Sequence, residues 1–507
     1  MPNPIKDILI VGGGTAGWVA ATFLNRFLDP GRCRVTLVES TAIGTIGVGE
    51  ATVPPLVGFL RAMSIDEAAF MKACNATYKL GIKFSDWHRG NDEIWHPFGV
   101  VGAARIDGLP LFHHWLRERQ DGRDVSPFTS YSLQALLGDM GRGPHPTTGN
   151  PLETSAIMRQ GAYAYHLDAQ AFAAFLRDIA VGRGVRHVID DVGSVALDEH
   201  GFISHVETGA HGPLQADLFI DCTGFAAKLI EGSLQDRFIS WSDQLLCDSA
   251  LTLRLPHDGN FHPYTRAEAM SAGWYWRIPL RHRIGTGYVY SSRFISSDQA
   301  AAELKERNGQ PDAESIHLRM KVGRRENFWV KNCVSIGLSA GFLEPLESTG
   351  IYLTQKCVEY LLDYFPDTGF DPHLIACYNS NVAREYDDAR DFVILHYLLN
   401  RREDTEFWRA AREVAVPDSL AQTLALYDHT GLVEWQNHSL FGDTAFYSIA
   451  SGFDRLPRAP HGMSRQMNAA TAWQAMQRIK ATNQELARTL PDHGELMLRL
   501  HARRFAS

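Results

Sequence analysis

The sequence has few cysteines, no long apolar run and no excess of positive charge, and each absence excludes a class of protein. No apolar stretch approaches the ~18 residues that a membrane-spanning helix needs. Lys and Arg number 49 against 58 Asp and Glu, so the net charge is −9; this argues against nucleic acid as a main partner, because phosphate binding needs clustered cations. The 7 cysteines are odd in number, scattered and never spaced as CxxC, which predicts buried thiols in a reducing compartment and neither a disulfide framework nor a zinc or other metal site: Cys33, Cys74, Cys222, Cys247, Cys333, Cys357 and Cys377.

What is present is an ordinary globular composition. Hydrophobic residues make up 45% and charged residues 21% of the 507 positions, which excludes disordered, collagen-like and coiled-coil chains. At ~150 residues per domain, the length corresponds to roughly three domains. The N-terminal apolar run leads into glycines rather than a cleavage site, so no signal peptide is expected. We therefore expect a cytoplasmic, multi-lobed enzyme.

The first part of the chain predicts an α/β fold. A strand at Ile8–Val11, a helix at Ala16–Leu28 and a strand at Arg34–Glu39 form a βαβ opening. A helix is expected at Glu67–Tyr78, and helical pieces with a turn-rich loop are expected in an insertion around 101–155.

The second part predicts two lobes. Strand patterns return between 185 and 345, the pattern from Gly350 onward is largely helical, and the tail at 470–507 is typical of an amphipathic helix. We expect the strands before 345 to share one core with the βαβ opening. The prediction is a Rossmann-type nucleotide-binding lobe in 1–350, discontinuous in sequence, and a mostly helical substrate lobe in 351–507.

The sharpest local motif is GGGTAG at 12–17, directly after the first strand. Gly12 permits the tight turn, Gly14 lets the backbone approach a pyrophosphate, and Gly17 lets the helix pack on the strand. Glu39 closes the second strand, where a carboxylate that binds ribose hydroxyls belongs. The spacing predicts a dinucleotide site; the alternative is a glycine-rich turn without a ligand.

FAD is favoured over NAD as the dinucleotide. The segment FIDCTG at 219–224 is an apolar strand ending in Thr-Gly, which is typical of the second contact in FAD-binding Rossmann proteins. No second GxGxxG occurs, so a nicotinamide-binding domain is not expected.

Four further segments resemble the flavin-dependent tryptophan halogenases. GWYWRIP at 273–279 matches their WxWxIP motif, and GVGEATVP at 47–54 resembles the strap between their flavin and halogenation sites. EPLESTG at 344–350 resembles their halide and glutamate segment, and Lys79 resembles their active-site lysine. The matches occur in the family's order over residues 8 to 352.

The resemblance implies which residues bind the cofactor and the halide. Trp274 and Trp276 would crowd the flavin and keep organic substrate away from it, although two neighbouring indoles on one strand face are ordinarily core residues. Halide would bind the backbone N–H groups of Thr349 and Gly350, unless these only form a helix N-terminus. Flavin contacts are expected from Gly12, Gly14, Thr15, Ala16, Gly17, Glu39, Gly49, Glu50, Ala51, Val188, Gly224, Gly337 and Ile351.

The resemblance also implies the groups that guide hypohalous acid. Lys79 would bind it as an ammonium donor or react as an amine to form a haloamine; the alternative is a solvated cation at the end of the 67–78 helix. Glu347 would orient the electrophile and stabilise positive charge on the ring, with Ser348 orienting Glu347 or the strap. Glu344 is expected to serve local structure, and Lys83 is not expected to take part.

For substrate binding, one segment of the sequence matches the family and another departs from it. His96 and Phe98 correspond to the aromatic pair that holds the indole. Phe446 and Tyr447 stand where tryptophan-specific members carry two tyrosines, and no glutamate or tryptophan follows nearby. The clamp for a zwitterionic amino acid is incomplete, which disfavours free tryptophan.

The expected function is an FADH2- and O2-dependent halogenase that attaches chloride or bromide to an indole or similar electron-rich arene. A separate NADH-dependent flavin reductase would supply FADH2. Two alternatives are a flavin-dependent aromatic hydroxylase and a non-catalytic flavin-binding protein; Lys79, Glu347 and the WYWRIP segment disfavour the first. Oligomeric state, halide preference and ring position are left open, with a homodimer as one option.

Overall fold

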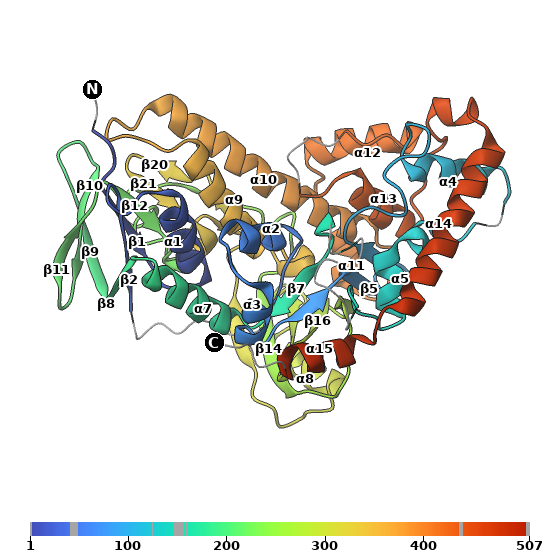
Figure 1. Ribbon diagram of the computed structural model, residues 1–507, viewed down its shortest axis with the longest axis horizontal. Coiled ribbons are helices and arrows are strands. Elements are labelled where there is room, and N and C mark those ends of the chain that lie inside the picture. The colour runs from blue at the N-terminus through green and yellow to red at the C-terminus, as the bar shows by residue number, and fades with distance from the viewer. Residues whose placement is uncertain are drawn as a thin grey trace.

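The computed structural model describes residues 3–40, 49–123, 125–146, 157, 160–434 and 440–502. One lobe is organised around a six-stranded sheet in the order β20-β21-β12-β1-β2-β8 (Figure 1). All neighbours pair in parallel except β20 and β21. The strands are β1 (Asp7–Val11), β2 (Arg34–Glu39), β8 (Arg186–Ile189), β12 (Leu218–Asp221), β20 (Trp329–Val330) and β21 (Cys333–Ser335). This confirms the βαβ opening and a parallel-sheet lobe that is discontinuous in sequence.

Helices and a small sheet cover this lobe. Helix α1 (Thr15–Phe27) packs against α7 (Ala169–Gly182) and α9 (Gly350–Asp363), because its buried face is apolar along most of its length. A three-stranded antiparallel sheet lies at the outer edge (Figure 1): β9 (Val192–Leu197), β10 (Ile203–Thr208) and β11 (Gly212–Gln215).

A second, seven-stranded sheet has the order β18-β14-β17-β16-β15-β5-β6 and is antiparallel except between β15 and β5. Trp274 and Trp276 on β16 share one face and the large core, whereas Tyr275 faces a separate cluster. The alternation along this strand is therefore confirmed. The strands are β5 (Gly81–Ser85), β6 (Glu93–Pro97), β14 (Ser249–Pro256), β15 (Thr265–Met270), β16 (Gly273–Pro279), β17 (Arg283–Tyr290) and β18 (Ile316–Arg319), with α8 (Ser297–Arg307) beside them.

The expected helix at Glu67–Tyr78 is wrong in its second half. Helix α3 ends at Ala73, and the chain continues as the strand β4 (Thr77–Lys79). Tyr78 pairs with Tyr165 of β7 (Ala164–Leu167), which lies between β4 and β3 (Glu50–Ala51). Lys79 is consequently a strand residue, not a helix cap. The remaining small elements are α2 (Pro55–Ala62), α3 (Glu67–Ala73), β13 (Phe238–Ser240), β19 (Gly323–Arg325) and β22 (Gly341–Phe342).

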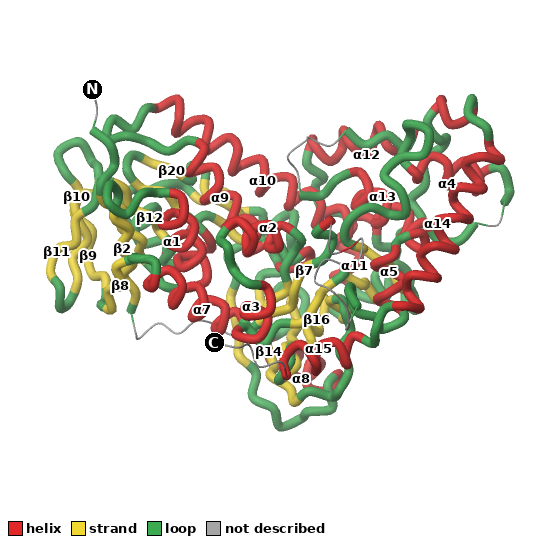
Figure 2. Tube along the Cα trace, in the orientation of Figure 1, coloured by secondary structure: helices red, strands yellow, loops and turns green. Residues whose placement is uncertain are grey.

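The second lobe is helical, as the red tubes on the right of Figure 2 show. The tail that was expected as one helix is two, α14 and α15, separated at Leu490–Asp492. Helices α4 and α5 of the 101–155 segment contact α14, and the 28-residue α10 runs between the lobes (Figure 1). The division at residue 350 stays a prediction. The helices are α4 (Leu111–Gln120), α5 (Leu133–Asp139), α10 (Pro372–Leu399), α11 (Glu406–Arg412), α12 (Asp418–Thr430), α13 (Asp443–Gly452), α14 (Ala469–Thr489) and α15 (His493–Ala502).

Two expectations from composition can be compared with these elements. None of the helices in the described ranges combines the length and the apolar composition that a membrane crossing requires. All seven cysteines are free thiols and six are buried, but Cys377 on α10 is exposed, so the expectation of uniformly buried thiols is wrong there.

Candidate active site

The glycine turn after β1 has geometry that only glycine allows. Gly12 has φ +112°, and its N–H donates to the Val38 carbonyl at 2.8 Å. A Cβ on Gly12 would lie 2.2 Å from the Cys222 carbonyl oxygen, and one on Gly17 would lie 1.9 Å from the Gly12 carbonyl oxygen. The turn is therefore pressed against β12 while α1 is pressed against the turn.

The N-terminus of α1 opens onto free space. A Cβ on Gly14 would meet no atom within 4 Å, and no side chain caps the helix. Thr15 and Ala16 form the first turn, whose N–H groups have no partner within the helix. A positively polarised helix terminus without a side-chain cap fits a pyrophosphate.

Other predicted cofactor residues surround the same turn. A Cβ on Gly13 would lie 1.7 Å from the Glu39 Oε2, so the carboxylate reaches over the turn; its Oε1 contacts the His187 Nε2 at 2.7 Å. Gly224 has φ +70° and faces open space. Further members of the set are Gly337, where a Cβ would lie 2.5 Å from that of Ala16, and the buried Val188 and Ile351. These residues fit an FAD dinucleotide.

The strap is described from Gly49 onward, because Gly47 and Val48 lie outside the described residues. Gly49 has φ +78°, and Glu50 and Ala51 form β3, paired with β7. Burial raises the pKa of the Glu50 carboxyl to about 7. Thr52 follows Ala51, and its backbone carbonyl accepts a hydrogen bond from the Lys79 Nζ. The strap segment thus runs directly to the lysine.

Lys79 lies wholly inside the protein, with no exposed surface. Its Nζ donates to the Ser348 Oγ at 2.8 Å and to the Thr52 carbonyl at 3.1 Å, and lies 5.1 Å from the centre of the Phe98 ring. Burial lowers the pKa of Lys79 to about 7, against an opposing effect of the Glu347 charge. The interpretation of Lys79 as a solvated cation is wrong.

Glu347 lies on the short 3-10 helix Pro345–Glu347, where His96 bonds to it and His396 lies nearby. Its Oε2 accepts from the His96 Nδ1 at 2.8 Å, and its Oε1 lies 2.9 Å from the His396 Nε2. Burial alone would raise the pKa of this carboxyl, but His96 and His396 lower it to about 2. Glu347 is therefore a buried carboxylate.

The backbone after Glu347 turns sharply into α9. Ser348 has φ +61°, a left-handed conformation that costs a non-glycine residue about 1 kcal/mol. Thr349 occupies the N-cap position of α9 without a side-chain capping bond, and Gly350 is exposed, with open space around a Cβ. The two predicted halide residues thus form an uncapped helix N-terminus beside Lys79 and Glu347.

Glu344 has a different environment from Glu347. It is fully buried, and its Oε1 accepts from the Trp274 Nε1 at 3.2 Å and from the Tyr397 hydroxyl at 2.6 Å. Burial raises its pKa to about 7. The Trp274 and Trp276 ring centres are 6.1 Å apart. Glu344 therefore fixes a tryptophan of the WYWRIP segment.

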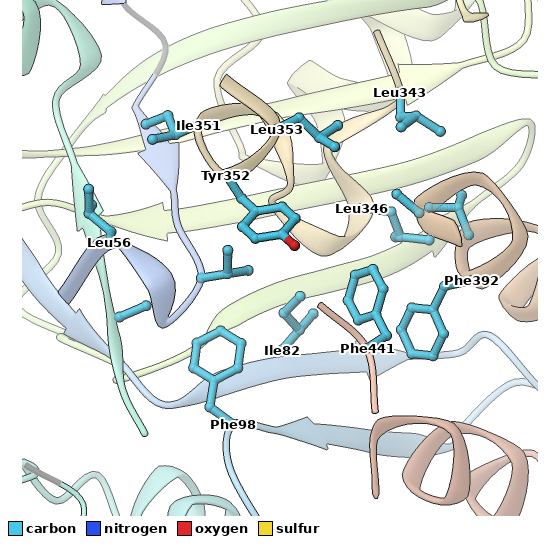
Figure 3. Packing of buried hydrophobic residues seen from close by; sticks show 14 of the residues in the cluster. Leu56, Ile82, Phe98, Leu343, Leu346, Ile351, Tyr352, Leu353, Phe392 and Phe441 are labelled. Carbon is cyan, nitrogen blue, oxygen red and sulfur yellow. The ribbon is translucent and has the colours of Figure 1, made fainter. Parts of the chain in front are cut away.

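An aromatic cluster adjoins Glu347. The His96 ring is 5.4 Å from that of Phe392 and 6.1 Å from that of Phe441, which stack 4.0 Å apart. Figure 3 shows this pair beside Leu346, with Phe98 beyond Ile82. His96 and Phe98 thus meet different partners, Glu347 and Lys79 respectively.

His396, Phe392 and Phe441 are site residues that the sequence reasoning missed. His396 and Phe392 lie on α10, one turn apart, and Phe441 precedes α13. For His396 and Phe392 the only signal is the largely apolar run FVILHYLL at 392–399. No spacing rule places them beside Glu347.

The C-terminal pair, Phe446 and Tyr447, packs against other aromatic residues of the helical lobe. Phe446 is fully buried against Tyr427, and Tyr447 stacks on Phe112 with ring centres 4.1 Å apart. Both belong to the core of the helical lobe. Their predicted contact with substrate stays a prediction.

Comparisons with known proteins agree with this geometry. The family model described as tryptophan halogenase matches residues 7–469. The chain is 36% identical to the tryptophan 7-halogenase RebH of Lentzea aerocolonigenes, over 99% of this chain and 100% of that protein. It is 44% identical to the tryptophan 6-halogenase SttH of Streptomyces toxytricini, over 83% of each.

Solved structures give the same result. A flavin-dependent halogenase from Xanthomonas campestris has a TM-score of 0.91 at 40% identity and covers 98% of both chains. BrvH, a flavin-dependent halogenase from Brevundimonas sp. BAL3, has a TM-score of 0.90 at 37% identity, over 98% of this chain and 99% of that one. The chain therefore belongs to the tryptophan halogenase family, and its nucleotide lobe has the fold of the flavin-dependent halogenases.

Proposed function

We propose that this enzyme uses FADH2 and O2 to oxidise chloride or bromide to hypohalous acid, which halogenates a neutral indole between Lys79 and Glu347. The observation that carries the proposal is a buried ammonium bonded to Ser348, the residue next to a buried carboxylate. An electrophilic halogen needs a donor that holds its oxygen, and a cationic ring needs a nearby negative charge.

The nucleotide lobe would hold the cofactor. Gly14 and the first turn of α1 face the pyrophosphate, and Glu39 faces a ribose. Bound FADH2 supplies the two electrons that reduce O2 as the halide is oxidised. One glycine motif leaves no second site for a nicotinamide, so a separate reductase provides the reduced flavin.

Halide would bind at the N-terminus of α9. The first N–H groups of this helix have no partner within it, and a monovalent anion satisfies them. Trp274, held by Glu344, and Trp276 present two indole rings on one sheet face. In this proposal the two indole rings keep a bulky arene away from the flavin, while the much smaller hypohalous acid passes.

Lys79 would receive the hypohalous acid. Its pKa of about 7 leaves both protonation states populated near neutral pH, so an ammonium donor and a haloamine-forming amine are both available. The pH profile separates them: activity that falls as pH rises through about 7 supports the ammonium, and activity that rises supports the amine.

Glu347 would accept the ring proton. The C–X bond forms as the O–X bond breaks, and the hydroxide takes a proton from the Lys79 ammonium and leaves as water. The ring carbon then loses its proton to the Glu347 carboxylate, and the C–H electron pair restores the aromatic ring. The low pKa of Glu347 keeps it ionised for charge stabilisation at the ring.

Neutral indoles are the proposed substrates in preference to free tryptophan. Asp454, the one acidic residue in the segment 445–454, could meet an amino group, but it lies 3.9 Å from Arg119. Phe446 offers no hydroxyl, and Tyr447 is stacked in the core. Since these described residues offer a polar tail no anchor, attack is expected at C3, the most nucleophilic carbon of the ring.

The test is incubation with FAD, a flavin reductase, NADH and chloride or bromide over an indole panel that includes tryptophan, analysed by mass spectrometry. The proposal expects halide-dependent mono-halogenated indole. A hydroxylated product without halide would support an aromatic hydroxylase, and no product from any arene would support a flavin-binding protein; either result contradicts the proposal.

A further inference from the structure

A pocket on the seven-stranded sheet collects side chains that donate hydrogen bonds. Its volume is about 50 Å³. Arg277 belongs to the WYWRIP segment, and because side chains alternate along a strand, it points away from the core face that holds Trp274 and Trp276. The pocket therefore lies on the opposite face of the sheet from these two indoles. The residues that line it are His262, Tyr264, Arg266, Arg277 and Pro279.

Three cations form a row across this face of the sheet. Lys83 on β5 pairs in register with Arg266 on β15. Arg266 pairs in turn with Arg277 on β16. Residues directly opposite each other have Cβ atoms about 5 Å apart, and like charges placed so are destabilising. Folding alone does not favour this row.

Carboxylates neutralise the two ends of the row. The Lys83 Nζ lies 2.5 Å from a Glu93 oxygen and 3.0 Å from an Asp139 oxygen. The Arg277 Nη2 donates to the Asp258 Oδ2 at 2.5 Å. The middle of the row is the part whose charge has to be balanced in another way.

Arg266 in the middle has no such partner. Its Nε lies 3.4 Å from the Glu268 Oε2 but makes no hydrogen bond to it. Glu268 already accepts two hydrogen bonds from Arg307, at 2.7 and 2.6 Å. Within the described ranges, the Arg266 side chain donates no hydrogen bond, although it is only 38% exposed. Its guanidinium is a charged fork without an acceptor.

Two aromatic side chains of the pocket are also without hydrogen-bond partners in the part of the chain that the structure describes. The His262 and Tyr264 rings lie side by side, with centres 5.2 Å apart. Burial lowers the pKa of His262, and the Arg277 charge lowers it further against an opposing effect of Asp258. The pocket thus combines positive charge with donors that lack acceptors.

A compact oxyanion satisfies this combination. The planar fork of an arginine matches two oxygens of a phosphate or a carboxylate. At ~10–15 Å³ for each water-sized group, the pocket holds a few such groups. Its donors come from two strands and from the loop before β15, and a tetrahedral anion presents oxygens in several directions where a carboxylate presents two in one plane.

We propose that this pocket, the arginine pocket, binds the phosphate group of a small ligand. The arginine pocket is separate from the Lys79 and Glu347 site, so the inference goes beyond the proposed function. Arg266 is the central ligand, and the phosphate supplies the negative charge that the row lacks at this position.

The first experiment is titration calorimetry of the full chain with inorganic phosphate at constant ionic strength. Saturating FAD occupies the glycine turn, and a chloride buffer occupies the N-terminus of α9. We expect saturable binding in the wild type, about 10-fold weaker in Arg266→Gln, because charge-assisted hydrogen bonds are lost. Arg319→Gln is the control, since Arg319 is an exposed arginine on β18 of the same sheet. Wild type without binding, or Arg266→Gln with wild-type affinity, would overturn the proposal.

The second experiment is thermal unfolding without phosphate. Removing a charge that repels its neighbours should leave the melting temperature of Arg266→Gln equal to that of the wild type or higher. A lower melting temperature with unchanged phosphate affinity would show that Arg266 only supports the sheet, and would overturn the proposal. Arg266→Lys keeps the charge without the fork and should also bind phosphate more weakly, so it decides if Arg266→Gln does not fold.

The third experiment identifies the ligand class by replacing inorganic phosphate with acetate or glycerol phosphate. Acetate should bind more weakly than phosphate, and acetate binding as tight as that of phosphate would overturn the phosphate assignment. Tighter binding of glycerol phosphate would indicate a phosphate ester as the ligand, and equal binding would indicate free phosphate. Either of these two results supports the site.

Discussion

Replacing Lys79 with methionine should make the protein more stable and inactive at once. The native ammonium has no exposed surface, and two hydrogen bonds only partly replace its hydration. Methionine fills a similar volume without a charge. The lysine therefore lowers stability for the sake of chemistry.

The magnitude follows from the pKa of Lys79, lowered from 10.5 to about 7. A difference of this size corresponds to about 5 kcal/mol of unfavourable free energy while the folded state is protonated. Losing the bonds to Ser348 and Thr52 offsets about 1–3 kcal/mol. We expect Lys79→Met to gain about 2–4 kcal/mol below pH 7.

The pH dependence has a definite sign. Between about 7 and 10.5 the unfolded chain binds more protons than the folded wild type, so wild-type stability rises with pH in this window. Lys79→Met lacks this titrating amine. Its gain in free energy of unfolding over the wild type should be complete below about pH 7 and disappear toward pH 10.5.

The assay is urea unfolding at several pH values, with Lys83→Met as the matched control. Lys83 is paired with Glu93 and Asp139, which raise its pKa despite partial burial, so its removal should not stabilise the protein. Lys79→Met should also lose halogenation while FADH2 oxidation still releases hydrogen peroxide. The reasoning would be refuted if Lys79→Met were less stable than wild type below pH 7, or if the difference in stability between them did not change with pH.

Three further predictions concern the reaction. Glu347→Gln should lower halogenation by about 10²–10⁴-fold, since it loses the charged proton acceptor, and Glu344→Gln should lower it less; product formation measured by mass spectrometry decides, and the reverse ranking would make Glu344 the acceptor. In a competition between equal indole and tryptophan, indole should be consumed faster, because Phe446 and Asp454 offer an ammonium no free anchor; faster formation of a single benzo-ring product from tryptophan would show an anchor elsewhere. The purified chain should not oxidise NADH, followed by absorbance, until a flavin reductase is added; robust oxidation by the chain alone would contradict a single nucleotide site.

The nucleotide lobe could be predicted from local pattern because its signals are local. The apolar strand, the glycine spacing and the acidic strand end lie within 40 residues, and each follows from backbone geometry. The face shared by Trp274 and Trp276 likewise needs only the period of a strand. Residue type and short spacing carry this information.

The environment of the reacting groups could not be predicted in the same way. Lys79 is a strand residue because Tyr78 pairs with Tyr165, a contact across 87 positions that overrides the continuing helical pattern. His396 meets Glu347 across 49 positions through the packing of α10. Family resemblance named Glu347 and His96, but it placed neither His96 nor His396 against the Glu347 carboxylate.

The interleaved order of the six-stranded sheet also has a consequence for biosynthesis. Ile8 of β1 pairs with Leu218 of β12, and Phe219 pairs in turn with Cys333. At ~5–20 residues per second, the ribosome completes β12 about 10–40 s after β1 has emerged. During that interval the apolar edge of the nascent β1 strand has no native neighbour on that side, and such edges aggregate. Yield in a recombinant host should therefore depend on chaperone capacity and growth temperature more than on the stability of the finished enzyme.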